Sequence, residues 1–99
     1  MVLDPVVVAS NQYKVVVENE RVRLLKIEYG AYETGPMHYH PDSVLVCLTE
    51  MNGTFTYPDG RTESMVLPPG AAMFLPATTH QPENKTPNRI EAYLIELKR

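Results

Sequence analysis

The sequence predicts an all-β protein, a sandwich or barrel of short strands that forms one domain over residues 1–99. Short apolar or alternating runs are separated by Gly, Pro, Asn and Asp, and no segment with helical periodicity exceeds two turns. None of the nine prolines lies inside one of these runs, as expected for loops that join strands. With 43% hydrophobic residues, the chain can build a single core of modest size.

The first half of the chain contains three predicted strands. YKVVVEN (13–19) is rich in β-branched residues, and VRLLKIEY (22–29) ends at Gly30. SVLVCLTE (43–50) is a continuous apolar run of strand length, followed by the turn pair Asn52-Gly53. Residues 1–20 are expected to form an N-terminal strand or arm.

The second half contains a predicted hairpin and two further strands. Residues 54–57 and 62–67 flank a Pro-Asp-Gly turn at 58–60, which is typical of a hairpin. A Pro-Pro-Gly turn at 68–70 precedes AAMFLP (71–76). RIEAYLIELK (89–98) alternates strongly and closes the domain.

Charge and cysteine content exclude several classes of partner. A net charge of −3 and a pI near 5.5 argue against nucleic acid or a membrane as the main partner. The N-terminal stretch has no basic leader and is too short to span a bilayer. Cys47 is the single cysteine, so no internal disulfide can form, and we expect a cytoplasmic protein.

The three histidines of the chain are placed unevenly. His38 and His40 are separated by one residue, and side chains at i and i+2 of a strand point to the same face. His80 follows another strand, in FLPATTHQPEN, and barrel closure would bring it close to the pair. Such a cluster can bind one metal ion or act as an acid/base group.

These motifs resemble those of the cupin superfamily, in particular small single-domain RmlC-like cupins of the cupin-2 type. The similarity covers residues 21–97 approximately. HYHPDSVLVCLTEMNG is similar to the first cupin motif, with His38 and His40 as its HxH pair. LPPGAAMFLPATTHQPEN is similar to the second, with His80 and Asn84 at matching positions. The resemblance implies a double-stranded β-helix, or jelly-roll barrel, whose lumen holds a divalent iron, manganese, nickel, zinc or copper ion.

One expected ligand of that family is missing. Cupins usually place a glutamate three or four residues after HxH, where this chain has Val44 and Leu45. Asp42 and Glu33 are the nearest carboxylates, and neither occupies the family position. We interpret Val44 as a core aliphatic that makes the lumen drier, so the predicted site consists of His38, His40 and His80.

Other polar and aromatic residues have structural interpretations. Cys47 is expected to be a buried small hydrophobe on the face opposite Val44. Tyr39 should point away from the histidines that flank it, and Asn84 should act as a turn residue. Tyr57 and Tyr93 are expected in the core, although they are also candidates for the pocket. The arginines at 21, 23 and 61 are expected to be solvated.

Three functions are compatible with this pattern. The first is a metalloenzyme of the oxygenase type that acts on a small organic molecule, since three-histidine cupins occur among dioxygenases. The second is a non-enzymatic cupin that binds a metal or a small ligand. The third is a metal-free acid/base isomerase or dehydratase, for which the sequence offers no obvious second polar partner beside a histidine. A homodimer is expected, because strands such as 13–19 would otherwise leave an exposed edge.

Overall fold

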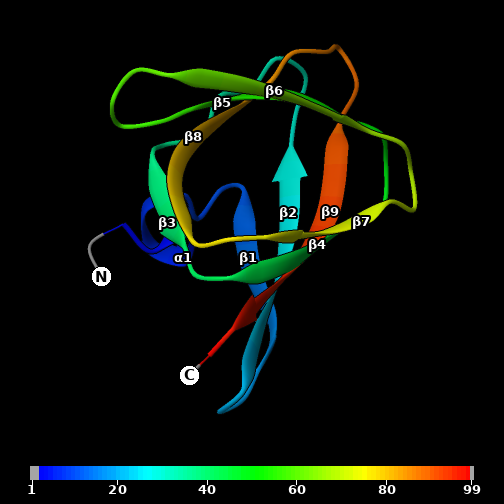
Figure 1. The fold of residues 1–99 in the computed structure, drawn as a ribbon. Coiled ribbons are helices and arrows are strands. Elements are labelled where there is room, and N and C mark those ends of the chain that lie inside the picture. The colour runs from blue at the N-terminus through cyan, green and yellow to red at the C-terminus, as the bar shows by residue number, and fades with distance from the viewer. Residues whose placement is uncertain (1–2, 99) are drawn as a thin grey trace.

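The computed structural model describes residues 3–98, which form two antiparallel β-sheets that face each other (Figure 1). In chain order the elements are α1 (Pro5–Val8), β1 (Tyr13–Glu18), β2 (Val22–Tyr29), β3 (His38–His40), β4 (Ser43–Cys47), β5 (Met51–Thr56), β6 (Thr62–Leu67), β7 (Ala72–Leu75), β8 (Thr78–Asn84) and β9 (Ile90–Leu97). One sheet has the order β1-β2-β9-β4-β7, and the other has the order β3-β8-β5-β6. The predicted all-β class is confirmed.

Each predicted strand corresponds to one observed strand, with small shifts at the ends. β2 and β6 have the predicted bounds, whereas β4 stops at Cys47 and β5 begins at Met51. Strand β8, which contains Pro82, was not among the predicted strands, since the sequence placed His80 after the strand at 71–76. Pro82 has no N–H to donate to a neighbouring strand, and its carbonyl accepts a hydrogen bond from the Gly35 N–H at 3.0 Å.

The core lies between the sheets and follows the alternation of the strands. In β9, buried and half-buried residues alternate from Ile90 to Leu97, and β4 alternates in the same way. Leu25 and Leu94 face each other across β2 and β9 and are almost fully buried. This alternation decides which side chains can reach the interior.

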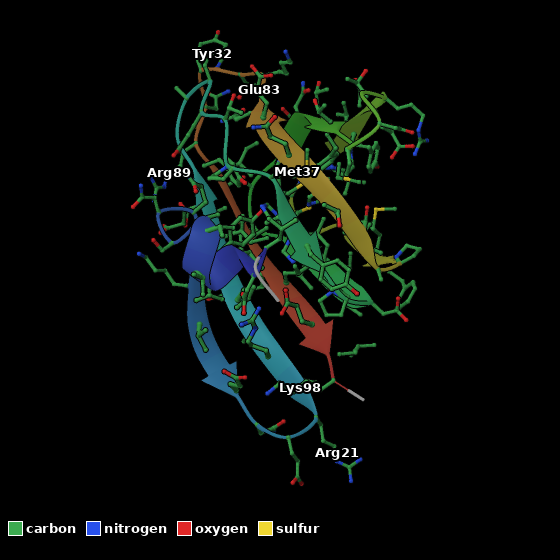
Figure 2. The ribbon with its side chains drawn as sticks, turned by 90° about the vertical axis from the view of Figure 1, so that its left-hand side faces the viewer. Arg21, Tyr32, Met37, Glu83, Arg89 and Lys98 are labelled. Carbon is green, nitrogen blue, oxygen red and sulfur yellow. The ribbon has the colours of Figure 1, made fainter. Side chains whose placement is uncertain are left out.

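The N-terminal arm contains one turn of helix before β1. Asp4 caps α1 by accepting a hydrogen bond from the Val6 N–H at 3.0 Å, and Pro5 occupies the first turn. The helix contacts β1 and β3 (Figure 2). No helix within residues 3–98 is long and apolar enough to cross a membrane.

Candidate metal centre

The three histidines come together on the inner face of the four-stranded sheet. His38 and His80 are direct partners in the antiparallel pairing of β3 with β8, and His40 lies two residues further along β3 on the same face. The exposed fractions of His38, His40 and His80 are 0%, 5% and 6%. One ring nitrogen from each lies within 4.8 Å of the other two. The predicted clustering is confirmed.

The backbone fixes the tautomer of His38. Its Nδ1 lies 2.9 Å from the carbonyl oxygen of Pro36, which can only accept a hydrogen bond. Nδ1 therefore carries the proton, and Nε2 presents a lone pair. That Nε2 atom is buried and has no hydrogen-bond partner among the described residues.

A buried carboxylate orients His40. Nδ1 of His40 lies 2.8 Å from Oε2 of Glu96, whose exposed fraction is 3%. Glu96 also forms a salt bridge with Arg23, whose Nη2 lies 2.7 Å from the other carboxylate oxygen, Oε1. The expectation that Arg23 is solvated is therefore wrong, because it lies in phase with the buried residues of β2 and pairs directly with Glu96 across β9.

His80 is held by aromatic packing. Its ring stacks on Phe55, with 4.8 Å between the ring centroids and 16° between the planes. The rings of His38 and His40 stand nearly perpendicular to it, at 4.9 and 5.4 Å. Nε2 of His80 is buried and, like that of His38, has no partner among the described residues.

Burial keeps two of the histidines neutral. It lowers the pKa of His38 to about 4, with a smaller contribution from the proximity of His40 and opposition from the Pro36 hydrogen bond. Burial also lowers the pKa of His80 to about 2, again with help from the other two histidines. At neutral pH both rings are uncharged, which is the form that binds a metal.

These residues fit a divalent metal ion. A buried nitrogen without a partner is costly, and two such atoms converge here beside a third imidazole. The hydrogen bonds of His38 and His40 to a carbonyl and a carboxylate are those that usually orient metal-bound histidines. Three imidazole nitrogens suit iron, nickel, copper or zinc and leave coordination positions for other ligands.

The position of the missing family glutamate requires a correction. Val44 is half-buried and pairs with Phe74 and Ile95, so it lies on the outer face of β4 and not in the lumen. Leu45 is the buried neighbour that faces the histidines' cavity. The error arises because residues 43, 45 and 47 face inward, a phase that the continuous apolar run does not reveal.

Neither of the two nearby carboxylates joins the histidines. Glu33 accepts hydrogen bonds from Gln12 and from the Gly30 N–H. Asp42 accepts one from the Ala77 N–H at 2.9 Å. The carboxylate that reaches the cluster is Glu96, which sequence reasoning missed. Its signal was its phase, because position 96 follows 90, 92 and 94 on the buried face of β9.

The remaining predictions have mixed outcomes. Cys47 is buried within the core, and Asn84 organises the turn after β8 by accepting from Thr86 N–H and donating to the carbonyls of Gly30 and Asn88.

Tyr39 is only half-buried, on the face of β3 opposite the histidines. Tyr57 and Tyr93 are half-buried and outside the core cluster, so the core placement is wrong for both. Arg21 and Arg61 are exposed as expected.

An apolar cavity of about 50 Å³ adjoins the histidines. Its walls include Leu45, Met51, Phe55 and Leu94, and His40 and His80 line it as well. A more open hollow of about 240 Å³ shares Phe55, Leu75 and His80 with this cavity. His80 thus lines both the interior cavity and the hollow.

Solved structures identify the architecture. A cupin domain protein from Bordetella pertussis Tohama I is 24% identical, with a TM-score of 0.81 over 88% of this chain and 92% of that one. An RmlC-like cupin family protein from Methanocaldococcus jannaschii, described as a double-stranded β-helix, is 19% identical, with a TM-score of 0.68 over 87% and 78% of the two chains. This chain has the cupin fold.

The cupin fold extends to proteins of different activity. A polyketide cyclase from Streptomyces resistomycificus is 20% identical, with a TM-score of 0.63 over 88% of this chain and 64% of that one. No protein-family model matches the sequence, and a search of curated proteins gave no match. The function of this protein must therefore be argued from its own site.

Proposed function

We propose that this cupin binds one divalent transition metal ion through His38, His40 and His80 and acts on a small organic molecule. One observation carries the proposal: two buried Nε2 atoms without partners lie beside a third imidazole that a carboxylate orients. When bound, such an ion supplies Lewis acidity and, if it is redox-active, the electron transfer that oxygenases require. Iron, manganese, nickel, copper and zinc all remain candidates.

The cavity favours a small substrate with an apolar body. Among the described residues, no lysine or arginine lines it, so the bound ion would be the positive charge available to an anionic or chelating group of the substrate. The hydroxyls of Tyr13 and Tyr29 lie 3.1 Å apart in its wall. One of their two protons serves that mutual hydrogen bond, and the other is left to donate to an oxygen of the substrate. A small ketone or diketone has this chemistry.

Elemental analysis of the purified protein tests the metal site. We expect about one divalent ion per chain, and we expect His38→Ala, His40→Ala and His80→Ala each to lose it. Thr79→Ala is the matched control, since Thr79 adjoins His80 on β8 but is only half-buried. A parent protein that takes up no iron, manganese, nickel, copper or zinc at neutral pH would contradict the proposal, as would three alanine variants that retain the parent's metal.

Oxygen uptake tests whether the metal-loaded protein acts as an oxygenase. The metal-loaded protein should consume dioxygen when small ketones and diketones are added, and His40→Ala should abolish the consumption. Stoichiometric metal without turnover would instead support a non-enzymatic cupin that binds a metal or ligand.

A specific observation supports a second candidate, a metal-free acid/base enzyme. Glu96 supplies the polar partner that the sequence did not offer, and His40 faces the cavity with Nδ1 bound to that carboxylate. His40 Nε2 could then accept a proton from a substrate carbon, as in an isomerase or dehydratase. Activity that survives removal of all metal by a chelator would favour this candidate over the first.

We also infer that two copies of the chain pair through β1. This strand is the edge of the five-stranded sheet, and Val15, Val16 and Val17 are exposed along it. Light scattering at micromolar concentration should give the mass of a dimer, and Val16→Lys should lower it to that of a monomer. A monomeric parent would refute the pairing.

A further inference from the structure

A continuous ionic network links the candidate ligand His40 to the opposite sheet. Glu96 uses both carboxylate oxygens: Oε2 meets His40 Nδ1 at 2.8 Å, and Oε1 accepts from Arg23 Nε at 2.9 Å. Arg23 and Glu96 are direct cross-strand partners of β2 and β9. They extend the series of inward-facing pairs that includes Leu25 with Leu94.

The network continues into the N-terminal segment. Arg23 donates two parallel hydrogen bonds to Asp4, from Nη2 to Oδ1 at 2.9 Å and from Nη1 to Oδ2 at 3.1 Å. Asp4 is also the N-cap of α1. The adjoining Leu3 carbonyl accepts from the N–H of Tyr39, the residue between His38 and His40, at 2.8 Å. The N-terminal segment is thus tied to the site at two points.

We propose that Glu96 and Arg23 are positioning residues for His40, and that Asp4 holds Arg23 in place from the N-terminal segment. A carboxylate that accepts from Nδ1–H fixes the proton there, orients the ring and makes Nε2 a better donor to a metal. Arg23 immobilises that carboxylate by occupying its other oxygen. This inference rests on the proposed metal-binding function, but its first step, the tautomer of His40, does not.

A purely structural role is the competing explanation, and it predicts something different. Buried ion pairs often add little net stability, and apolar residues of similar volume can replace them without loss. The double variant Arg23→Met/Glu96→Met should therefore fold, because no unpaired charge remains inside. A structural role predicts a properly folded double variant with an unchanged site, whereas a positioning role predicts a folded variant with an altered one.

Nitrogen-15 NMR of the imidazoles in the metal-free protein tests the first step. We expect His40 of the parent to be protonated at Nδ1, and we expect this preference to be lost in Arg23→Met/Glu96→Met. His38 provides the internal control, since the Pro36 carbonyl should keep its Nδ1 protonated in both proteins. A parent His40 that is protonated at Nε2 alone, or a double variant with an unchanged His40 tautomer, would overturn the proposal whether or not the protein binds metal.

Competition with a chelator for Zn²⁺ tests the second step. Glu96→Gln should weaken Zn²⁺ binding by about 10- to 100-fold. Glu91→Gln is the matched control, because Glu91 lies on the same strand but pairs with Lys26 on the outer face, and it should bind Zn²⁺ like the parent. Equal affinities for the parent and Glu96→Gln would contradict the positioning role. If the parent binds no Zn²⁺ but its His40 is protonated at Nδ1 and loses this preference in Arg23→Met/Glu96→Met, only the metal-binding function is refuted.

The contribution of the N-terminal segment is tested by a second matched pair. Asp4→Asn should weaken Zn²⁺ binding by less than Glu96→Gln does, because it acts through Arg23. Asp59→Asn removes a comparable partner from Arg61 at the exposed hairpin and should leave Zn²⁺ binding unchanged. If Asp4→Asn and Asp59→Asn bind Zn²⁺ equally well, the N-terminal segment is not part of the network.

Discussion

The two sheets contribute different parts of the candidate metal centre. The four-stranded sheet carries all three histidines, on β3 and β8. The five-stranded sheet carries no histidine and supplies the Arg23–Glu96 pair together with much of the apolar wall. Metal ligands and the groups that orient them are therefore encoded in different strands and by different sequence signals. The ligands form a motif, whereas their support depends on the phase of β2 and β9.

The largest effect is expected from placing a carboxylate on the inner face of the five-stranded sheet. Leu45→Glu buries a charge in the apolar cavity, so the free energy of unfolding of the metal-free protein should fall by at least about 3 kcal/mol. A divalent metal should restore part of the loss if the new carboxylate reaches it. Val44→Glu points outward and should cost less than about 1 kcal/mol without tightening metal binding. Urea unfolding with and without Zn²⁺ distinguishes the two positions, and equal losses would contradict the assigned phase of β4.

Which residues of a strand face inward could be predicted from the sequence for some strands but not for β4. The strands with strong alternation or clear turns were predicted closely, because burial of one face and turn chemistry are local signals. The three histidines were found because spacing and family motif agreed. Glu96 and Arg23 were missed, since recognising an ion pair requires knowing that β2 and β9 are neighbours in register. Glu96 and His40 are hydrogen-bonded in the fold but lie 56 residues apart in the sequence, and no local sequence pattern connects them.

The second prediction compares the stability effect of a substitution in the core of the five-stranded sheet with that of a substitution on the surface of the four-stranded sheet. Leu94 on β9 is 2% exposed, so Leu94→Ala should leave a cavity and lower the free energy of unfolding by about 2–5 kcal/mol. Val66 on β6 is 62% exposed, and Val66→Ala should change stability by less than about 0.5 kcal/mol. Chemical denaturation of both variants measures the difference. A costly Val66→Ala would indicate that the four-stranded sheet is covered in solution, for example by a second copy.

Acid should destabilise the metal-free protein through the histidine-bearing sheet. The pKa values of His38 and His80 are lowered to about 4 and about 2 in the folded protein, below the usual 6.5 of the unfolded chain. Above pH 6.5 both states are neutral at these positions. Between pH 6.5 and these lowered values only the unfolded chain takes up the proton, so stability falls by up to about 1.4 kcal/mol per pH unit for each ring. Urea midpoints at pH 7.5 and pH 5.0 measure this loss, and identical midpoints would argue against two buried neutral histidines.

The smallest effect, and the most informative about the five-stranded sheet, concerns the hydroxyl pair of Tyr13 and Tyr29. Both rings are buried, and burial raises the pKa of both phenols well above the usual value, so both stay protonated. Tyr29→Phe leaves the Tyr13 hydroxyl buried without its partner and should cost about 1–3 kcal/mol. The double variant Tyr13→Phe/Tyr29→Phe removes both polar groups from an apolar wall and should cost less than Tyr29→Phe alone. A double-mutant cycle in urea measures the coupling. If the two single losses simply add, the hydroxyls do not depend on each other, and the spare proton assigned to substrate recognition loses its structural basis.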